Sequence, residues 1–380
     1  MNWNTLLDDC IDFTQRLIQT PSMPHEEAAI ADLIAAEMRR LDFDEVWGDA
    51  VGNVYGRLHG ADRSLPALVL NTHLDHVDPG DPALWSVPPY SGAIVNGRIL
   101  GRGAADIKGP LAVQVYSMAA LRRLGVPPRR DVVFTGVVQE EIGGAGALHW
   151  VRHKAYDVAL VVLGEPSDNN LALGHRGVLQ LWVTFNGRSV HASVPEKGQN
   201  PNYALAAFLQ NLAAAQGQLS AHPLLGPTTV SPTIVEVDTK SQNVTPAWTR
   251  VLLDFRTATE SLHSLQTFVR RLAGSWPISI SPAWEPAAPD ADQPVSGFYT
   301  PPESAVVQHV QALLAAGMGH APALTSYRFA TDGRHFVPYN IPIVGYAPAE
   351  ENQAHVADES ISIDKMRASL KGHVALLRDF

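Results

Sequence analysis

Histidine and acidic side chains follow the apolar runs of this 380-residue sequence in an arrangement that suits metal binding. His73 and Asp75 come directly after the apolar run ALVL in ALVLNTHLDHVDPG, and their side chains lean to the same side of an extended chain. A carboxylate that holds the second ring nitrogen of a histidine fixes its tautomer and raises its basicity as a metal ligand. His-x-Asp pairs are also common as structural pairs, so this passage alone leaves both interpretations open.

Further acidic and histidine residues occupy comparable places. Asp106 in GRILGRGAADIKGP follows a glycine-rich turn and precedes a predicted helix, where helix capping is the simpler explanation. Glu140 and Glu141 follow an apolar strand in FTGVVQEEIGGAG; buried neighbouring carboxylates need a cation or a proton, although solvated surface glutamates would give the same pattern. Glu165 in VVLGEPSD repeats the arrangement, and His355 lies in the polar passage NQAHVADES.

Together these positions predict a metal site, because ionisable residues at successive strand ends are hard to explain one by one as caps. Carboxylates and imidazoles without thiolates suit zinc or manganese, and bridging carboxylates favour a pair of metals. We therefore expect two divalent ions, zinc first, with cobalt or manganese as alternatives.

The elements that must position these residues follow an α/β pattern. Strands that alternate with helices predict a mainly parallel sheet sandwiched by helices, and such sheets place ligand sites at the carboxyl ends of their strands. The predicted elements are helices ending near residue 19 and over 25–41, strands over 67–73, 131–138 and 158–166, and, later, a helix over 304–317, a strand over 341–348 and a final helix.

A different pattern begins near residue 177, where GVLQLWVTFNG alternates like a half-exposed antiparallel strand. The order from there to about residue 288 is β-α-β-β-α-β, which predicts an inserted ferredoxin-like α+β domain. The catalytic domain would then comprise residues 1–176 plus 289–380, and the inserted domain residues 177–288. The Pro- and Asp-rich stretch 285–304 predicts a connection.

Composition excludes several classes of protein. The net charge of -10, from 28 basic and 38 acidic residues, offers no basic footprint for nucleic acid. Cys10 is the only cysteine, which excludes an internal disulfide and a thiolate zinc site and fits a reducing compartment. The first residues do not resemble a signal peptide, and no apolar run is long enough to span a bilayer. We expect a cytoplasmic protein without membrane or nucleic-acid partners.

Four passages together resemble a family of cocatalytic-zinc amidohydrolases: HLDHVDPGDPALWSVPPYSG, GRILGRGAADIKG, QEEIGGAGA and LGEPS, followed by the histidine of NQAHVADE. That family includes acetylornithine deacetylase, succinyl-diaminopimelate desuccinylase, aminoacylase and glutamate carboxypeptidase, and the resemblance covers nearly the whole chain in the same motif order. It implies that His73 and Glu165 bind one metal, that Glu141 and His355 bind the other, and that Asp106 bridges both.

The resemblance also implies the remaining roles. Asp75 would orient His73, and Glu140 would be the general base that accepts a proton from the activated water and passes it to the leaving nitrogen. GRSVHASVPEKGQNP resembles the family segment that places a histidine, here His191, beside the active site of a partner subunit, where it stabilises the oxyanion. The inserted domain would therefore be a lid and dimerisation domain, and the protein a homodimer.

Three positions resemble the family's substrate-binding residues: Asn243 in SQNVTP, Arg256 in LDFRTA and Arg334 in ATDGRHF. Arginine binds a substrate carboxylate in a bidentate manner, and the nearby Arg328 is an alternative to Arg334. Glu165, rather than aspartate, at its ligand position resembles the deacylases and carboxypeptidases more than the di- and tripeptidases.

The predicted function is hydrolysis of an amide bond in a small N-acyl amino acid that carries a free carboxylate, by a deacylase similar to acetylornithine deacetylase or succinyl-diaminopimelate desuccinylase. An exopeptidase of the same family is the alternative within the enzyme class. A catalytically silent dimeric binding module would be expected to lack a ligand or Glu140, and none is missing. A one-metal peptidase of another fold is not supported, because the sequence has no HExxH helix.

Overall fold

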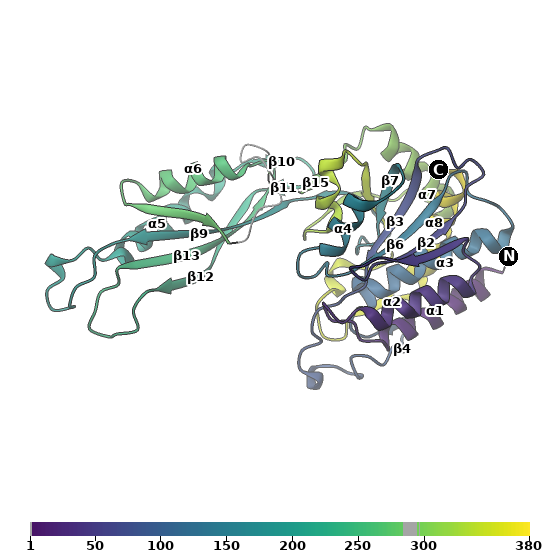
Figure 1. Ribbon diagram of the computed structural model, residues 1–380, viewed down its shortest axis with the longest axis horizontal. Helices are drawn as coiled ribbons and strands as arrows, with labels where there is room; N and C mark the ends of the chain where they lie inside the picture. The colour runs from purple at the N-terminus through teal and green to yellow at the C-terminus, as the bar shows by residue number, and fades with distance from the viewer. Residues whose placement is uncertain (1, 284–294, 296) are drawn as a thin grey trace. The chain divides into compact units, whose positions relative to one another are not determined.

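The computed structural model describes residues 2–283, 295 and 297–380, which form two compact units (Figure 1). The first unit runs to Gly174 and resumes over Phe298–Tyr327 and Thr331–Phe380. The second comprises His175–Gly297 and Arg328–Ala330, so the insertion predicted at residues 177–288 falls within it. The connection predicted at residues 285–304 lies largely outside the described residues.

A nine-stranded sheet forms the centre of the first unit, in the order β1-β2-β6-β3-β7-β17-β8-β15 with β16 beside β8. Its inner strands β6, β3, β7 and β17 are parallel, whereas β2 and β8 are antiparallel to their inner neighbours, which confirms the mainly parallel sheet. Every residue of β3 and β6 is buried, which explains their continuous apolar runs. The strands are β1 Glu45–Gly48, β2 Val54–Leu58, β3 Ala67–His73, β6 Val132–Val137, β7 Val158–Leu163, β8 Leu171–His175, β15 Phe298–Tyr299, β16 Leu324–Tyr327 and β17 Ile343–Gly345.

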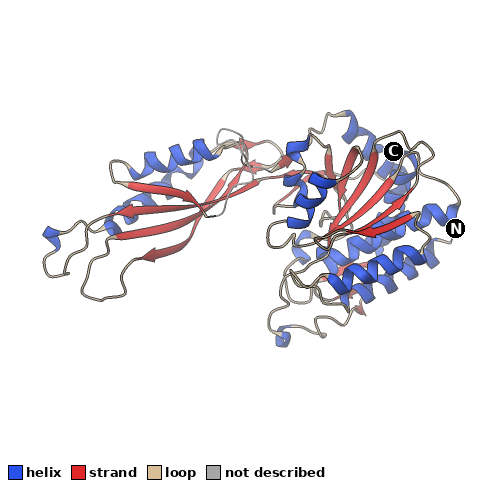
Figure 2. Ribbon diagram, in the orientation of Figure 1, coloured by secondary structure: helices blue, strands red, loops and turns tan. Residues whose placement is uncertain are grey.

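Helices flank this sheet (Figure 2). They are α1 Trp3–Ile18, α2 Ala28–Arg40, α3 Gly109–Leu124, α4 Ala145–His153, α7 Ala305–Met318 and α8 Ile363–Asp379. In α3 every residue from Gly109 to Leu121 is buried, because α1 and α8 pack on it and it also contacts β3 and β6. A small sheet, β18-β5-β4, was not predicted; it contains β4 Ala93–Val95, β5 Arg98–Leu100 and β18 Ser360–Ser362.

The second unit has the predicted β-α-β-β-α-β order. Its elements are β9 Gly177–Asn186, α5 Pro201–Ala215, β12 Thr229–Val237, β13 Trp248–Thr257, α6 Leu262–Ala273 and β14 Ile278–Pro282, with a short unpredicted hairpin of β10 Ala221–His222 and β11 Gly226–Pro227. The four main strands form an antiparallel sheet in the order β12-β13-β9-β14. Alternate residues of β9 are buried, and these pack with apolar residues of α5 and α6 in one core.

Short helical turns complete the described chain: η1 Pro82–Leu84, η2 Ala104–Lys108, η3 Pro195–Lys197, η4 Gln216–Gln218, η5 Asp332–His335, η6 Val337–Tyr339 and η7 Glu351–Gln353. None of the described helices combines the length and the apolar character that crossing a bilayer requires.

Candidate active site

The predicted ligands meet at one edge of the large sheet. His73 is the last residue of β3, and Glu165 follows the end of β7 by two residues. Glu140 and Glu141 follow β6, which ends at Val137. Because β6, β3 and β7 are parallel neighbours, their carboxyl ends share an edge, and the side chains that follow them converge.

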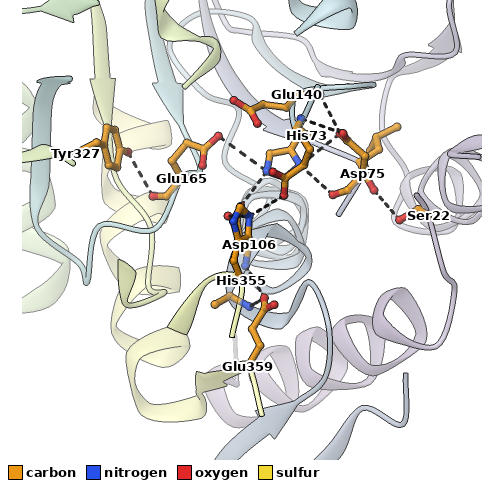
Figure 3. A network of polar contacts seen from close by, with 12 residues as sticks. Ser22, His73, Asp75, Asp106, Glu140, Glu165, Tyr327, His355 and Glu359 are labelled. Carbon is orange, nitrogen blue, oxygen red and sulfur yellow. Dashed lines mark hydrogen bonds and ion pairs between the residues drawn. The ribbon is translucent and has the colours of Figure 1, made fainter. Parts of the chain in front are cut away.

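Asp106 lies between two histidines at this edge (Figure 3). Its Oδ1 is 2.9 Å from Nε2 of His73, and its Oδ2 is 3.3 Å from Nε2 of His355. Glu141 Oε1 lies 3.0 Å from the same nitrogen of His355, and Glu165 Oε1 lies 4.0 Å from Nε2 of His73. One carboxylate therefore faces two separate imidazoles, and the same Nε2 of each imidazole also lies near a second carboxylate, Glu165 for His73 and Glu141 for His355.

The backbone around Asp106 is positioned by Glu359. Glu359 Oε1 accepts hydrogen bonds from the backbone N–H groups of Ala105, at 2.9 Å, and Asp106, at 3.0 Å. Its Oε2 accepts a hydrogen bond of 2.6 Å from Arg102, and both side chains of this pair are buried. The peptide bond between Asp106 and Ile107 is cis. Asp106 does not cap α3, because that helix begins at Gly109; the simpler explanation from the sequence is wrong.

Asp75 is buried beside His73 and contacts both that histidine and the glutamate pair. Nδ1 of His73 lies 3.0 Å from the backbone oxygen of Asp75 and 3.5 Å from its carboxylate. The two carboxylate oxygens accept hydrogen bonds from the backbone N–H groups of Glu140, at 3.1 Å, and Glu141, at 3.0 Å. Asp75 therefore contacts His73 and also accepts hydrogen bonds from the backbone of Glu140 and Glu141.

Burial dominates the electrostatics of three carboxylates at the site. It raises the pKa of Glu140 well above the usual value, and the charge of Asp332 raises it further. Burial likewise raises the pKa of Glu165, with the negative charge of Asp106 adding to the effect. It raises the pKa of Asp332 to about 7, and neither carboxylate oxygen of Asp332 has a hydrogen-bond partner among the residues that the structure describes. So many buried carboxylates are costly unless positive charge is supplied among them.

The histidines have the opposite surroundings. Burial alone would lower the pKa of His73, but hydrogen bonds with Asp106 and Asp75 raise it well above the usual value. Hydrogen bonds with Asp106 and Glu141 raise the pKa of His355 to about 10. Burial opposes the low pKa of Asp106, which the two histidines nevertheless impose. Positive charge is therefore stabilised on both sides of Asp106.

This donor set fits divalent metal ions. His73, Asp106 and Glu141 each offer a ligand atom, and these atoms all lie within 4.8 Å of one another. Imidazole nitrogen and carboxylate oxygen are the ligand types that zinc and manganese accept. A pair of metal ions bound here would supply positive charge that offsets the cost of burying these carboxylates.

Of the other predicted residues, His191, Asn243 and Arg256 belong to the second unit and Arg334 belongs to the first. In the second unit, His191 Nε2 lies 3.4 Å from Asn243 Nδ2, and both side chains are exposed. The guanidinium of Arg256 donates a hydrogen bond to Asp254 at 2.8 Å. Arg256 lies near the end of β13, about 26 Å along the strand from its first residue, Trp248, which follows Asn243 by five positions. Arg256 therefore does not join the pair of His191 and Asn243. Arg334, in η5 of the first unit, contributes a positive charge that opposes the raised pKa of Glu140.

Sequence reasoning missed two buried acids of this site. Glu359 lies in the quoted passage NQAHVADES, four residues after His355, but nothing in the sequence shows that it reaches the backbone of Asp106. Asp332 lies in the ATDGRHF passage that drew attention only to its arginine. In the sequence Asp332 is an aspartate next to a glycine, a pattern that is common in solvated turns and so does not predict a buried site residue.

A mainly parallel sheet that presents histidines and carboxylates at its carboxyl edge defines a class of metal-dependent hydrolase. Residues 69–379 match the model of peptidase family M20/M25/M40, so the chain belongs to this family and is an enzyme of the metallopeptidase and amidohydrolase type. Succinyl-diaminopimelate desuccinylase of Rhodospirillum centenum is 28% identical over 374 residues, which cover 93% of this chain and 93% of that protein.

Solved structures share the fold over nearly the whole chain. Aminopeptidase PepT from Bacillus cereus matches with a TM-score of 0.78 at 19% identity, covering 100% of this chain and 98% of that one. The YxeP protein of Bacillus subtilis, described as a dinuclear metal binding peptidase, matches with a TM-score of 0.71 at 14% identity, covering 99% and 100%. The expected fold, a mainly parallel sheet flanked by helices with an inserted α+β part, is confirmed.

Proposed function

We propose that the protein is a two-metal hydrolase that cleaves the amide bond of a small N-acyl amino acid. The observation that carries this proposal is the position of Asp106, whose two oxygens face Nε2 of His73 and Nε2 of His355 at 2.9 and 3.3 Å. A bridging carboxylate between two ligand groups is what a metal pair needs. Glu165 would complete the first group and Glu141 the second, and zinc is the metal that this donor set favours.

Metal ions bound here would lower the pKa of water and polarise a substrate carbonyl. Glu140 would take the proton from that water and deliver it to the leaving nitrogen, which requires a carboxylate near the ligands that is not itself a ligand. Its pKa, raised by burial and by Asp332, suits a base that must also return the proton. The N–H bonds from Glu140 and Glu141 to Asp75 keep the base and its neighbouring ligand in fixed relation.

The substrate class is supported by charge and by the relatives. Arg334 lies on the catalytic unit close enough to influence Glu140, and its guanidinium is suited to a substrate carboxylate. The R. centenum relative bears the name of an N-succinyl hydrolase, whereas the PepT neighbour is an aminopeptidase. Rates of hydrolysis of N-acetyl, N-succinyl and N-carbamoyl amino acids, compared with those of di- and tripeptides, separate a deacylase from an exopeptidase. Faster turnover of the peptides would contradict the deacylase assignment and favour an exopeptidase.

Replacement of Glu140 by alanine tests the mechanism. We expect metal content near that of the wild type and loss of nearly all turnover, since the residue is a base and not a ligand. Metal analysis of the purified variant accompanies the rate measurement, and Glu141→Ala, which removes a ligand, should lose metal as well as activity. Substantial turnover by the Glu140→Ala variant would contradict the mechanism, and so would turnover by a fully metal-free wild type.

We also propose a homodimer formed through the second unit, with His191 acting in the partner's site. The support is an edge strand, β12, with exposed Ile234, Val235 and Val237, which is an open template for pairing with another chain. In mixed dimers, a His191→Ala subunit and a Glu140→Ala subunit should together recover part of the activity that each homodimer lacks. No recovery in verified mixed dimers would refute action in trans.

The cytoplasmic location expected from the sequence is tested by cell fractionation.

A further inference from the structure

The turn that carries the proposed base and its neighbouring ligand is bonded to side chains at four successive backbone N–H groups. The strand β6 ends at Val137, so these N–H groups have no strand partner. Each is instead accepted by a side-chain oxygen from a distant part of the chain. The four bonds run from Val138 to Asn53 at 3.0 Å, from Gln139 to Glu27 at 3.1 Å, from Glu140 to Asp75 at 3.1 Å and from Glu141 to Asp75 at 3.0 Å.

The backbone conformation at Gln139 explains why this bonding matters. Gln139 has φ of 61°, in the left-handed region that residues other than glycine rarely adopt. Gln139 directly precedes Glu140 and the turn that begins there, so its backbone conformation sets the direction in which the Glu140 side chain leaves the chain. The carbonyl of Gln139 accepts a hydrogen bond from Gly144 at 2.6 Å, which closes the turn on its other side. A strained conformation persists only where its surroundings determine it.

Glu27 is a buried carboxylate whose hydrogen bond to Gln139 is its contact with a distant part of the chain. It is 5% exposed, directly before α2, and its side chain does not cap that helix. Among the described residues no Lys, Arg or His forms an ion pair with it. Burial raises the pKa of Glu27, and hydrogen bonds from the backbone N–H groups of Glu27 itself, His25 and Gln139 oppose that rise only in part. A buried, unpaired carboxylate costs free energy that an apolar residue would not. The adjacent Glu26 is exposed and provides a matched comparison.

We propose that Glu27 is a positioning residue for this reaction: by accepting the N–H of Gln139 it fixes the turn that aims Glu140 at the reacting atoms. The effect on catalysis rests on the proposed function, whereas the hydrogen bond between Glu27 and Gln139 is independent of it. Asp75 positions the two residues after the turn, and Glu27 positions the turn itself. Glu27 lies before residue 69, where the match to the family model begins, and it supplies this contact from the first part of the chain.

Kinetics of Glu27→Ala, Glu27→Gln and Glu26→Ala test the proposal. Glu27→Ala should lower kcat by about 10–100-fold, the usual effect of removing a residue that orients an active-site group, with KM changed less than about threefold. Glu27→Gln should stay within about threefold of the wild type, because its amide oxygen accepts the same N–H. Glu26→Ala should match the wild type. Equal activity of the two alanine variants would overturn the proposal, as would a glutamine variant no better than Glu27→Ala.

Hydrogen exchange at the Gln139 amide separates this proposal from the proposed function. In Glu27→Ala that amide should exchange roughly tenfold faster or more, while the thermal transition and the exchange of the β6 amides stay close to those of the wild type. Unchanged exchange at Gln139 would overturn the positioning role, and so would a general loss of protection throughout β6. Should the wild type hydrolyse none of the amides tested, the function fails while the exchange result still decides the contact.

Discussion

Removal of the Asp75 carboxylate should affect the base and the metal ligands together. Asp75 accepts the backbone N–H groups of Glu140 and Glu141 at 3.1 and 3.0 Å, and its carboxylate lies 3.5 Å from Nδ1 of His73. Asp75→Ala removes all three contacts. Asp75→Asn keeps one acceptor oxygen and turns an NH2 group towards the other N–H, so it should lose one of the two backbone bonds.

The structure sets the size of the effect. Hydrogen bonds to a charged group contribute about 1.5–3 kcal/mol each, so alanine forfeits about 3–6 kcal/mol of positioning and asparagine about half of that. If this free energy appears in the transition state, kcat/KM should fall roughly 10²- to 10⁴-fold for Asp75→Ala and about 10- to 150-fold for Asp75→Asn. Metal affinity should also fall, by about 10–100-fold, because His73 and Glu141 are less well oriented.

The assay is steady-state hydrolysis of the best amide substrate under saturating metal, beside metal competition with a chelating indicator. Asp78→Ala is the control, because Asp78 is an exposed aspartate three residues away in the same loop. Wild-type kcat/KM in Asp75→Asn would refute the reasoning. Equal losses in the asparagine and alanine variants would also refute it, since the number of retained N–H contacts would then be irrelevant.

Three other perturbations follow from the site. Glu359→Ala leaves the buried Arg102 without its carboxylate partner, so the free energy of unfolding should fall by about 3–5 kcal/mol and the Tm by about 6–20 °C; a Tm within about 2 °C of the wild type would contradict this. His355, whose pKa of about 10 means that it is protonated at neutral pH in the metal-free protein, must lose that proton to bind a metal. Metal affinity should therefore rise by about tenfold per pH unit for each displaced proton, up to about pH 10, and a titration showing no pH dependence would count against His355 as a ligand. Arg334→Ala should raise KM by about 10–150-fold for substrates with a free carboxylate and leave that of their amidated analogues unchanged, and a uniform change in both would remove Arg334 from substrate binding.

The apolar runs and the residues that follow them were predictable from the sequence for a physical reason. A parallel strand buried on both faces must be continuously apolar, so β3, β6 and β7 are visible as runs that stop where polar chemistry begins. Neighbouring parallel strands then bring their carboxyl ends together, which places His73 and Glu165 at one edge. Periodicity likewise revealed the β-α-β-β-α-β order of the second unit.

The contacts that aim the site were not predictable, because they join residues far apart in the sequence. Glu359 bonds to the backbone of Asp106 across 253 positions, and Glu27 bonds to that of Gln139 across 112. A single glutamate outside any periodic pattern does not indicate which backbone N–H group its carboxylate will accept a hydrogen bond from. Short elements were also missed: the strand predicted over residues 341–348 is only Ile343–Gly345, and the three-residue strands of the small sheet gave no signal.

Anomalous scattering from crystals of the metal-loaded protein, recorded at the zinc absorption edge, tests the two-metal site most directly. We predict two peaks about 3.5–4 Å apart, one on each side of Asp106, the first in contact with His73 and the second with His355. A single peak at full metal saturation, or two peaks that do not share Asp106, would contradict the assignment of this carboxylate as the bridge.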